Sequence, residues 1–142
     1  MKKIVLAVMV IFVMLIVSCA TTGEINDDTF RRIYSRYSND LILDGAARYT
    51  VRSGDTLANI SRALYQDPFY YPVIMLASRD VVADPDKIEP GMILTIPDLE
   101  RNKANARARA AMKGVITDCA QIEEDRGRSA TAQGLRNHAN SL

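Results

Sequence analysis

The spacing of apolar residues changes several times along the chain, and each change predicts a new element. Around Tyr49 and Val51, apolar and polar residues alternate in a way that is typical of a β-strand. Residues 56–65 carry apolar side chains at helical spacing, which predicts a first helix, and a second helix is expected from about Phe69. Residues 93–96 have the composition of a second strand. This order predicts an α+β unit in which two antiparallel strands pack against two helices.

Turn-forming residues separate these elements. Gly54 reaches positive φ without steric cost, so the chain can pass from strand to helix within a few residues, and Asp55 is expected at the helix N-cap. The sequence Glu89-Pro90-Gly91 has Pro and Gly in the order that a type II turn requires, and Asp84-Pro85-Asp86 favours another turn. The turns at Gly54 and near Ile88 are expected to lie close together.

Residues 49–97 resemble a LysM module, the small carbohydrate-binding domain that holds proteins on N-acetylglucosamine polymers such as peptidoglycan and chitin. The resemblance implies binding rather than catalysis. It is carried by residues spread over the whole segment: Tyr49-Thr50-Val51-Arg52-Ser53-Gly54-Asp55-Thr56-Leu57, Ile60, Tyr65, Asp84-Pro85-Asp86-Lys87-Ile88-Glu89-Pro90-Gly91 and Ile96-Pro97.

The resemblance also implies where a sugar binds. An acetamido group presents an acceptor, a donor and a methyl, and two adjacent turns can offer matching backbone groups beside a small apolar patch. The groove is expected between the first turn and the loop before the second strand, with Ile88 against the methyl. Turn geometry and capping alone are an alternative explanation for Gly54, Asp55 and Pro90-Gly91. The expected glycan-binding residues are Gly54, Asp55, Thr56, Leu57, Pro85, Asp86, Lys87 and Ile88.

Ser78 departs from the pattern of such modules, which often carry an Asn at the end of the second helix. Asn offers both an amide donor and a carbonyl acceptor, whereas Ser offers only a hydroxyl. We therefore expect Ser78 to weaken a hydrogen bond that braces the groove loop.

An aromatic stripe precedes the module, within an expected helical extension at residues 29–48. Its members are spaced for one face of a short helix. Because a module of about 50 residues buries only roughly 60% of its unfolded surface, the stripe is expected to pack on it. The alternative is that the stripe stacks on sugar rings. The stripe consists of Phe30, Ile33, Tyr34 and Tyr37.

Residues 98–142 predict a C-terminal helical hairpin. Good helix formers run from Leu99 to about Asp125 without a Pro, Gly127 interrupts them, and a shorter helix is expected from Ser129. The charged residues of the first helix are expected on a solvated face, and the alternative is an electropositive strip that meets acidic wall polymer or lipid headgroups. These residues are Arg101, Lys103, Arg107, Arg109 and Lys113.

The first 18 residues have the pattern of a signal peptide. Lys2-Lys3 precede an unbroken apolar run from Ile4 to Val17, which is shorter than the roughly 20 residues that cross a bilayer. The end of this run, Ile16-Val17-Ser18-Cys19, resembles the lipobox of bacterial lipoproteins.

The lipobox resemblance implies that Cys19 becomes the lipidated first residue of the mature protein. Two or more acyl chains, palmitate among them, anchor firmly because each buried methylene contributes about 0.8 kcal/mol. Residues 19–28 are then a polar tether. A plain secretory signal with an incidental Cys is the alternative.

Charge and residue inventory exclude several function classes. The chain has 18 Lys and Arg against 17 Asp and Glu, and loss of residues 1–18 changes the formal charge from +1 to −1, which does not favour nucleic acid. Cys119 is the only other Cys and lies on an apolar helical stripe, where a thiol is normally inert, and His138 is the only His. No His, Cys, Asp or Glu spacing resembles a metal site, so neither metal nor cofactor is expected.

Carboxylate pairs are the remaining route to catalysis. Asp84 and Asp86, or Glu123, Glu124 and Asp125, have the residue types of a glycosidase acid and base. They are better explained as turn formers and helix-surface charges, because a small two-stranded module offers no deep cleft. We therefore expect a non-enzymatic protein.

Together these features predict a lipid-anchored LysM lipoprotein of a bacterial envelope that binds peptidoglycan without cleaving it, on the periplasmic face more than on the cell surface. The alternative is that the module and the helices at 99–142 are a platform for protein partners. Either way, no nucleic acid is expected as a partner.

Overall fold

The computed structural model describes residues 27–142. The expected signal peptide, Cys19 and most of the tether lie outside the described residues. The elements in chain order are α2 (Asp27–Tyr37), β1 (Ala47–Thr50), α3 (Leu57–Tyr65), the 3-10 helix η1 (Pro68–Tyr70), α4 (Tyr71–Ala77), β2 (Ile93–Ile96), α5 (Leu99–Ala104), α6 (Ala106–Asp125) and α7 (Ser129–Ser141).

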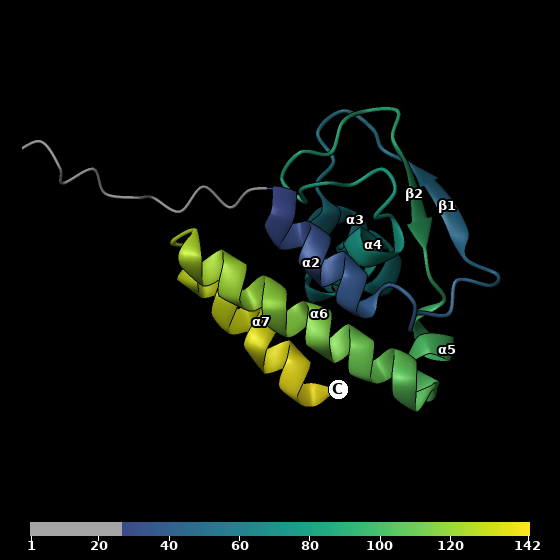
Figure 1. Cartoon of the computed structure of the whole chain (residues 1–142). Helices are drawn as coiled ribbons and strands as arrows, with labels where there is room; N and C mark the ends of the chain where they lie inside the picture. Colours follow the sequence, from purple (N-terminus) through teal and green to yellow (C-terminus); the bar gives the residue numbers. More distant parts are fainter. Residues whose placement is uncertain (1–26) are drawn as a thin grey trace, which may run out of the picture.

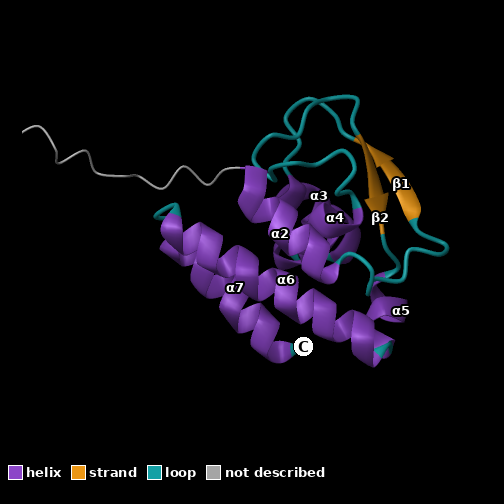
Figure 2. Ribbon diagram, viewed as in Figure 1, coloured by secondary structure: helices purple, strands orange, loops and turns teal. Residues whose placement is uncertain are grey.

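The arrangement confirms an α+β fold with a helical C-terminal region. In Figure 1 the two strands lie at one side, and α6 and α7 run side by side along the other, with α2, α3 and α4 between them. Figure 2 shows the same separation of strands from helices and the long loops that connect them.

The sheet is a single antiparallel pair, β1 with β2, in which Tyr49 lies opposite Leu94. The pairing continues past the strand ends, because the Val51 N–H donates to the Met92 carbonyl at 2.8 Å and the Gly91 N–H to the Val51 carbonyl at 2.9 Å. Gly91 has a φ of +94° and the Met92 N–H donates back to the Glu89 carbonyl, as the predicted type II turn requires.

The N-cap of α3 is Thr56, so the expectation of Asp55 at this position is wrong. The Thr56 side chain accepts from the Asn59 N–H at 3.2 Å. The Asp55 carboxylate is already used one residue earlier, where it accepts from the Arg52 N–H and from the Tyr49 hydroxyl, both at 2.8 Å. Asp55 therefore stabilises the turn at Gly54 rather than the helix.

Ser78 braces β2 directly, and the expectation that it weakens a hydrogen bond to the groove loop stays a prediction. Its hydroxyl accepts from the Thr95 N–H at 2.9 Å and lies 3.2 Å from the Thr95 carbonyl, to which it donates. Because Ser78 is buried, a single hydroxyl here replaces the two polar groups that an Asn amide would provide.

Helix α4 is the centre of the core. Residues Val73, Ile74, Met75 and Leu76 are fully buried, so the helix is covered on all sides. It packs on α3 and β2, and also on α2 and α6. The C-terminal helices contribute Met112, Ile116 and Leu135 to the same core, so they belong to one packed unit with the module.

The aromatic stripe of α2 is part of this core. Phe30, Ile33 and Tyr34 are buried, and the Tyr34 hydroxyl donates to the Val82 carbonyl at 2.7 Å. The alternative in which the stripe stacks on sugar rings is therefore wrong. Helix α2 begins at Asp27, two residues before the expected extension.

The composition predicts one continuous helix from Leu99 to about Asp125, but the structure has two helices there, α5 and α6. Asn105 is extended between α5 and α6, and its side chain accepts from the N–H groups of Arg107 and Ala108, both at 3.0 Å. An Asn competes with the helical backbone for these donors and so begins a new helix here.

Two helical glycines allow close packing of the hairpin. A Cβ on Gly134 would lie 2.2 Å from the Phe69 ring, and a Cβ on Gly114 would lie 2.5 Å from the Tyr37 ring. Gly134 therefore lets α7 approach the module, and Gly114 lets α6 approach α2.

Candidate functional site

The two turns of the module meet at a small cavity of about 130 Å³. Its lining comes from the start of α3, the loop before β2, and one residue each from α4, α6 and α7. It is lined by Thr56, Leu57, Ala58, Tyr71, Pro85, Asp86, Glu123 and Thr131. We call this cavity the turn pocket.

Half of the expected site residues line the turn pocket. Thr56 and Leu57 come from the first turn and Pro85 and Asp86 from the second, so the expected proximity of the two bends is present. The other four do not line it. They are Gly54, Asp55, Lys87 and Ile88.

Each of these four has a structural explanation. Gly54 has a φ of +85°, which favours glycine, and is exposed. The Asp55 carboxyl has a lowered pKa, first because it accepts from the Arg52 backbone and then because of the Tyr49 hydroxyl. Lys87 is exposed, 3.9 Å from an Asp84 oxygen, and Ile88 is half-buried against the core.

The C-terminal hairpin holds the second turn in place through ion pairs. Arg126 donates to Asp86 at 2.8 Å and lies 3.2 Å from an Asp84 oxygen. Arg128 donates to Asp86 at 2.9 Å and to Glu123 at 2.7 Å. We call these five residues the ion cluster. Its three carboxylates are neutralised mainly by the two Arg, so the negative charge beside the turn pocket is largely paired.

Sequence reasoning missed the contributions of Ala58, Tyr71, Glu123 and Thr131 to the turn pocket. Ala58 lies next to the expected first turn and could have been included from helical spacing alone. Glu123 and Thr131 are distant in sequence, and no local pattern indicates that the turn at Gly127 reaches the loop before β2.

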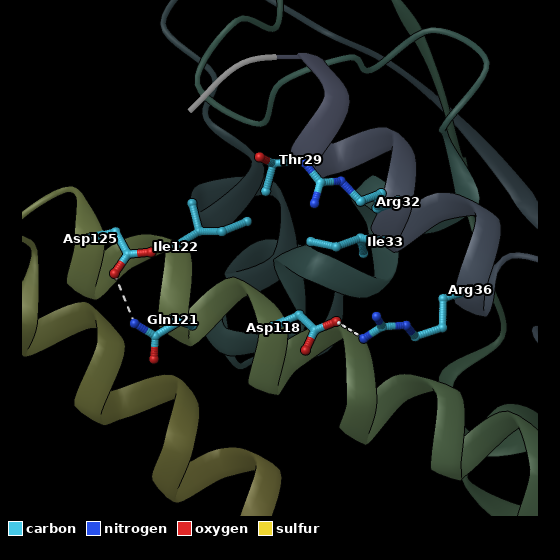
Figure 3. Close-up of a pocket in the computed structure, with 8 residues that line it drawn as sticks. All are labelled: Thr29, Arg32, Ile33, Arg36, Asp118, Gln121, Ile122 and Asp125. Carbon is cyan, nitrogen blue, oxygen red and sulfur yellow. Dashed lines mark hydrogen bonds and ion pairs between the residues drawn. The ribbon is translucent and has the colours of Figure 1, made fainter. Parts of the chain in front are cut away.

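A second cleft, of about 260 Å³, lies between α2 and α6. Figure 3 shows Ile33 from α2 and Ile122 from α6 facing each other across it. Several polar side chains that line it already bond to one another: Arg36 pairs with Asp118 at 3.1 Å, and Gln121 donates to Asp125 at 2.8 Å. None of the expected site residues line this cleft.

The residue chemistry at Cys119 and His138 does not favour catalysis. Cys119 is buried in the core, and burial raises the pKa of its thiol far above the range in which thiolates form at neutral pH. His138 Nδ1 lies 3.1 Å from an Asp67 oxygen, and its side chain is only 10% exposed. These two residues therefore have separate structural environments.

His138 makes stability depend on pH. Burial lowers its pKa against an opposing effect of Asp67, and Nε2 has no hydrogen-bond partner among the described residues. The unfolded chain therefore binds a proton more readily, so stability is complete above about pH 6.5 and is lost as pH falls below it.

We expect urea unfolding at pH 7.5 and 5.5 to show this loss in the wild-type chain, by at most about 1.4 kcal/mol per pH unit for one proton. His138→Gln, which cannot titrate, is expected to change less between the two pH values. If the free energy of unfolding decreases equally in both proteins, groups other than His138 cause the pH dependence.

Among residues 27–142, no helix combines the length and the apolar character that a membrane crossing needs. Within the same residues, no three His, Cys, Asp or Glu side chains converge in a way that could hold a metal ion.

Comparisons with known proteins find the LysM domain at residues 49–97. The chain is 46% identical over 50 residues to the potassium binding protein Kbp of Escherichia coli, a match that covers 35% of this chain and 34% of Kbp. It is 41% identical over 56 residues to two esterases of Mycobacterium tuberculosis, covering 39% of this chain and 12% of each esterase. No solved structure matches the chain.

The chain thus spans about a third of Kbp and much less of the esterases. Potassium binding and ester hydrolysis belong to those relatives and are not carried over to this chain. The order of elements, the two turns and the sequence match agree, and the chain therefore contains a LysM domain at residues 49–97.

Proposed function

We propose that this protein binds N-acetylglucosamine-containing glycan, peptidoglycan above all, without cleaving it, and that a lipid on Cys19 tethers it in a bacterial envelope. The observation that carries the proposal is the turn pocket, where Thr56, Leu57, Pro85 and Asp86 of a LysM domain meet.

The turn pocket suits one acetamido group rather than a large ligand. Its volume of about 130 Å³ is below the roughly 300–1,000 Å³ of pockets that enclose drug-sized molecules. Buried Leu57 and Pro85 supply apolar surface for a methyl, and the exposed Thr56 supplies a hydroxyl. Such a site binds weakly alone, and tethering beside the polymer raises the effective sugar concentration.

The carboxylates near the pocket support binding without hydrolysis. A glycosidase needs one carboxyl kept protonated by its surroundings and a second one placed to assist it. Asp84, Asp86 and Glu123 are instead engaged in ion pairs and hydrogen bonds with Arg126 and Arg128, so none of them is left available for either role. We therefore expect no clearing of peptidoglycan in a zymogram of the purified protein.

Sedimentation with purified peptidoglycan tests the binding part of this proposal. We expect the full chain in mild detergent to sediment with the polymer and to be released by N-acetylglucosamine oligomers. A chain that stays in the supernatant at all polymer concentrations would contradict it.

Cys19→Ser tests the anchor separately. Metabolic labelling with palmitate is expected to mark the wild-type protein and not the variant, and the variant is expected to leave the membrane fraction because it lacks the acyl chains. Equal labelling of both proteins, or a wild-type protein without label, would contradict lipidation at Cys19.

A further inference from the structure

A second cavity, of about 330 Å³, adjoins the turn pocket. The two cavities share Ala58, Tyr71 and Thr131 as lining residues, so they lie side by side, and we call the two together the groove. The second part extends from these residues toward the other end of α3. We call it the side channel; it is lined by Ala58, Arg62, Pro68, Phe69, Tyr71, Ala130 and Thr131.

The side channel lies between α3 of the LysM domain and α7 of the hairpin. Ala58 and Arg62 are one turn apart on α3 and so share a face of that helix. Ala130 and Thr131 from the first turn of α7 form the other wall. Phe69, which is half-buried, supplies aromatic surface on which an apolar face of a sugar ring can rest.

Arg62 is the one charged side chain that lines the side channel. It is exposed and takes part in no ion pair or side-chain hydrogen bond within residues 27–142. This differs from the Arg residues at the other end of the groove, since Arg126 and Arg128 are held by Asp86. The side channel therefore offers a free guanidinium in the cavity next to the turn pocket.

We infer that Arg62 binds a carboxylate of the glycan, so the groove prefers carboxylate-bearing N-acetyl polymers to neutral ones. This inference rests on the proposed function. A guanidinium forms strong charge-assisted hydrogen bonds with a carboxylate and has no comparable partner on a neutral sugar. In peptidoglycan the carboxylate comes from the peptide stem or, where the stem has been removed, from the lactyl group of the sugar. Chitin has neither group.

Binding of the full chain in mild detergent to three polymers tests this inference: intact peptidoglycan, peptide-free peptidoglycan strands, and chitin. We expect Arg62→Gln to weaken binding to at least one carboxylate-bearing polymer by roughly threefold to tenfold and to leave chitin binding unchanged. If the variant loses binding only to intact peptidoglycan, the carboxylate that Arg62 binds belongs to the peptide stem. If it loses binding to the peptide-free strands, that carboxylate belongs to the lactyl group.

Arg48→Gln is the matched control. Arg48 is an exposed residue of β1 that lines neither part of the groove, so this change removes the same charge elsewhere. An Arg62→Gln variant that binds every polymer as the wild type does, or loses chitin binding equally, would overturn the inference and leave the proposed function intact. A wild-type chain that binds none of the three would overturn both.

Discussion

Replacing Arg126 with Ala is expected to lower the free energy of unfolding by roughly 3 kcal/mol, because it removes one partner from a largely buried group of charges. The Arg126 side chain is 15% exposed, beside Asp84 at 14% and Glu123 at 6%. Its guanidinium also lies 5.5 Å from the centre of the Phe30 ring, so the same side chain joins the hairpin, the loop before β2 and α2. Urea unfolding measures this loss.

Arg136→Ala is the control for this prediction. Arg136 pairs with Glu124 at 2.9 Å, but both side chains are more than a third exposed, and such pairs contribute only about 0–1 kcal/mol. We expect a clearly larger loss of unfolding free energy for Arg126→Ala than for Arg136→Ala. Equal effects would show that the ion cluster does not hold the hairpin on the LysM domain.

Ala58→Trp is expected to reduce peptidoglycan binding by at least roughly tenfold, because Ala58 lines both cavities and an indole there takes up space that a ligand would occupy. Thr131→Trp on the opposite wall is expected to have the same effect for the same reason. Sedimentation of each full-length variant with purified peptidoglycan measures the change.

Ala63→Trp is the matched control on the same helix. Ala63 is exposed and lines neither cavity, so the added indole meets solvent and binding is expected to be unchanged. Urea unfolding of the three Trp variants shows whether each keeps the wild-type fold. Wild-type binding by a folded Ala58→Trp variant would place the glycan outside the groove.

Local chemistry made the LysM part of the fold predictable. Gly54 and Gly91 both have positive φ at turns. Because glycine is the residue that adopts positive φ without steric cost, the residue type alone indicates a turn at each position. The choice between Asp55 and Thr56 as N-cap was less predictable, because both residue types cap helices well. Thr56 is the cap because the Asp55 carboxylate already accepts a hydrogen bond from the Arg52 N–H. Asn105 likewise begins a helix because its side-chain oxygen accepts hydrogen bonds from the first free N–H groups of α6.

The C-terminal side of the groove could not be predicted in this way. Asp86 and Arg126 are 40 residues apart, and no periodicity within either segment encodes their contact. Gly134 is a clearer case, because a glycine inside a helix is unfavourable by itself and makes sense only once the Phe69 ring is seen against it. The hairpin is therefore predictable from its own sequence, whereas its docking against the LysM domain depends on contacts between residues far apart in the chain.

The most direct test of the central claim is an NMR titration of the full chain, in detergent, with N-acetylglucosamine oligomers. We expect the backbone amide shifts of Thr56, Leu57, Ala58 and Asp86 to change together and to saturate, since these residues line the turn pocket. Absence of shifts at saturating sugar, or shifts confined to the cleft between α2 and α6, would contradict glycan binding at the meeting point of the two turns.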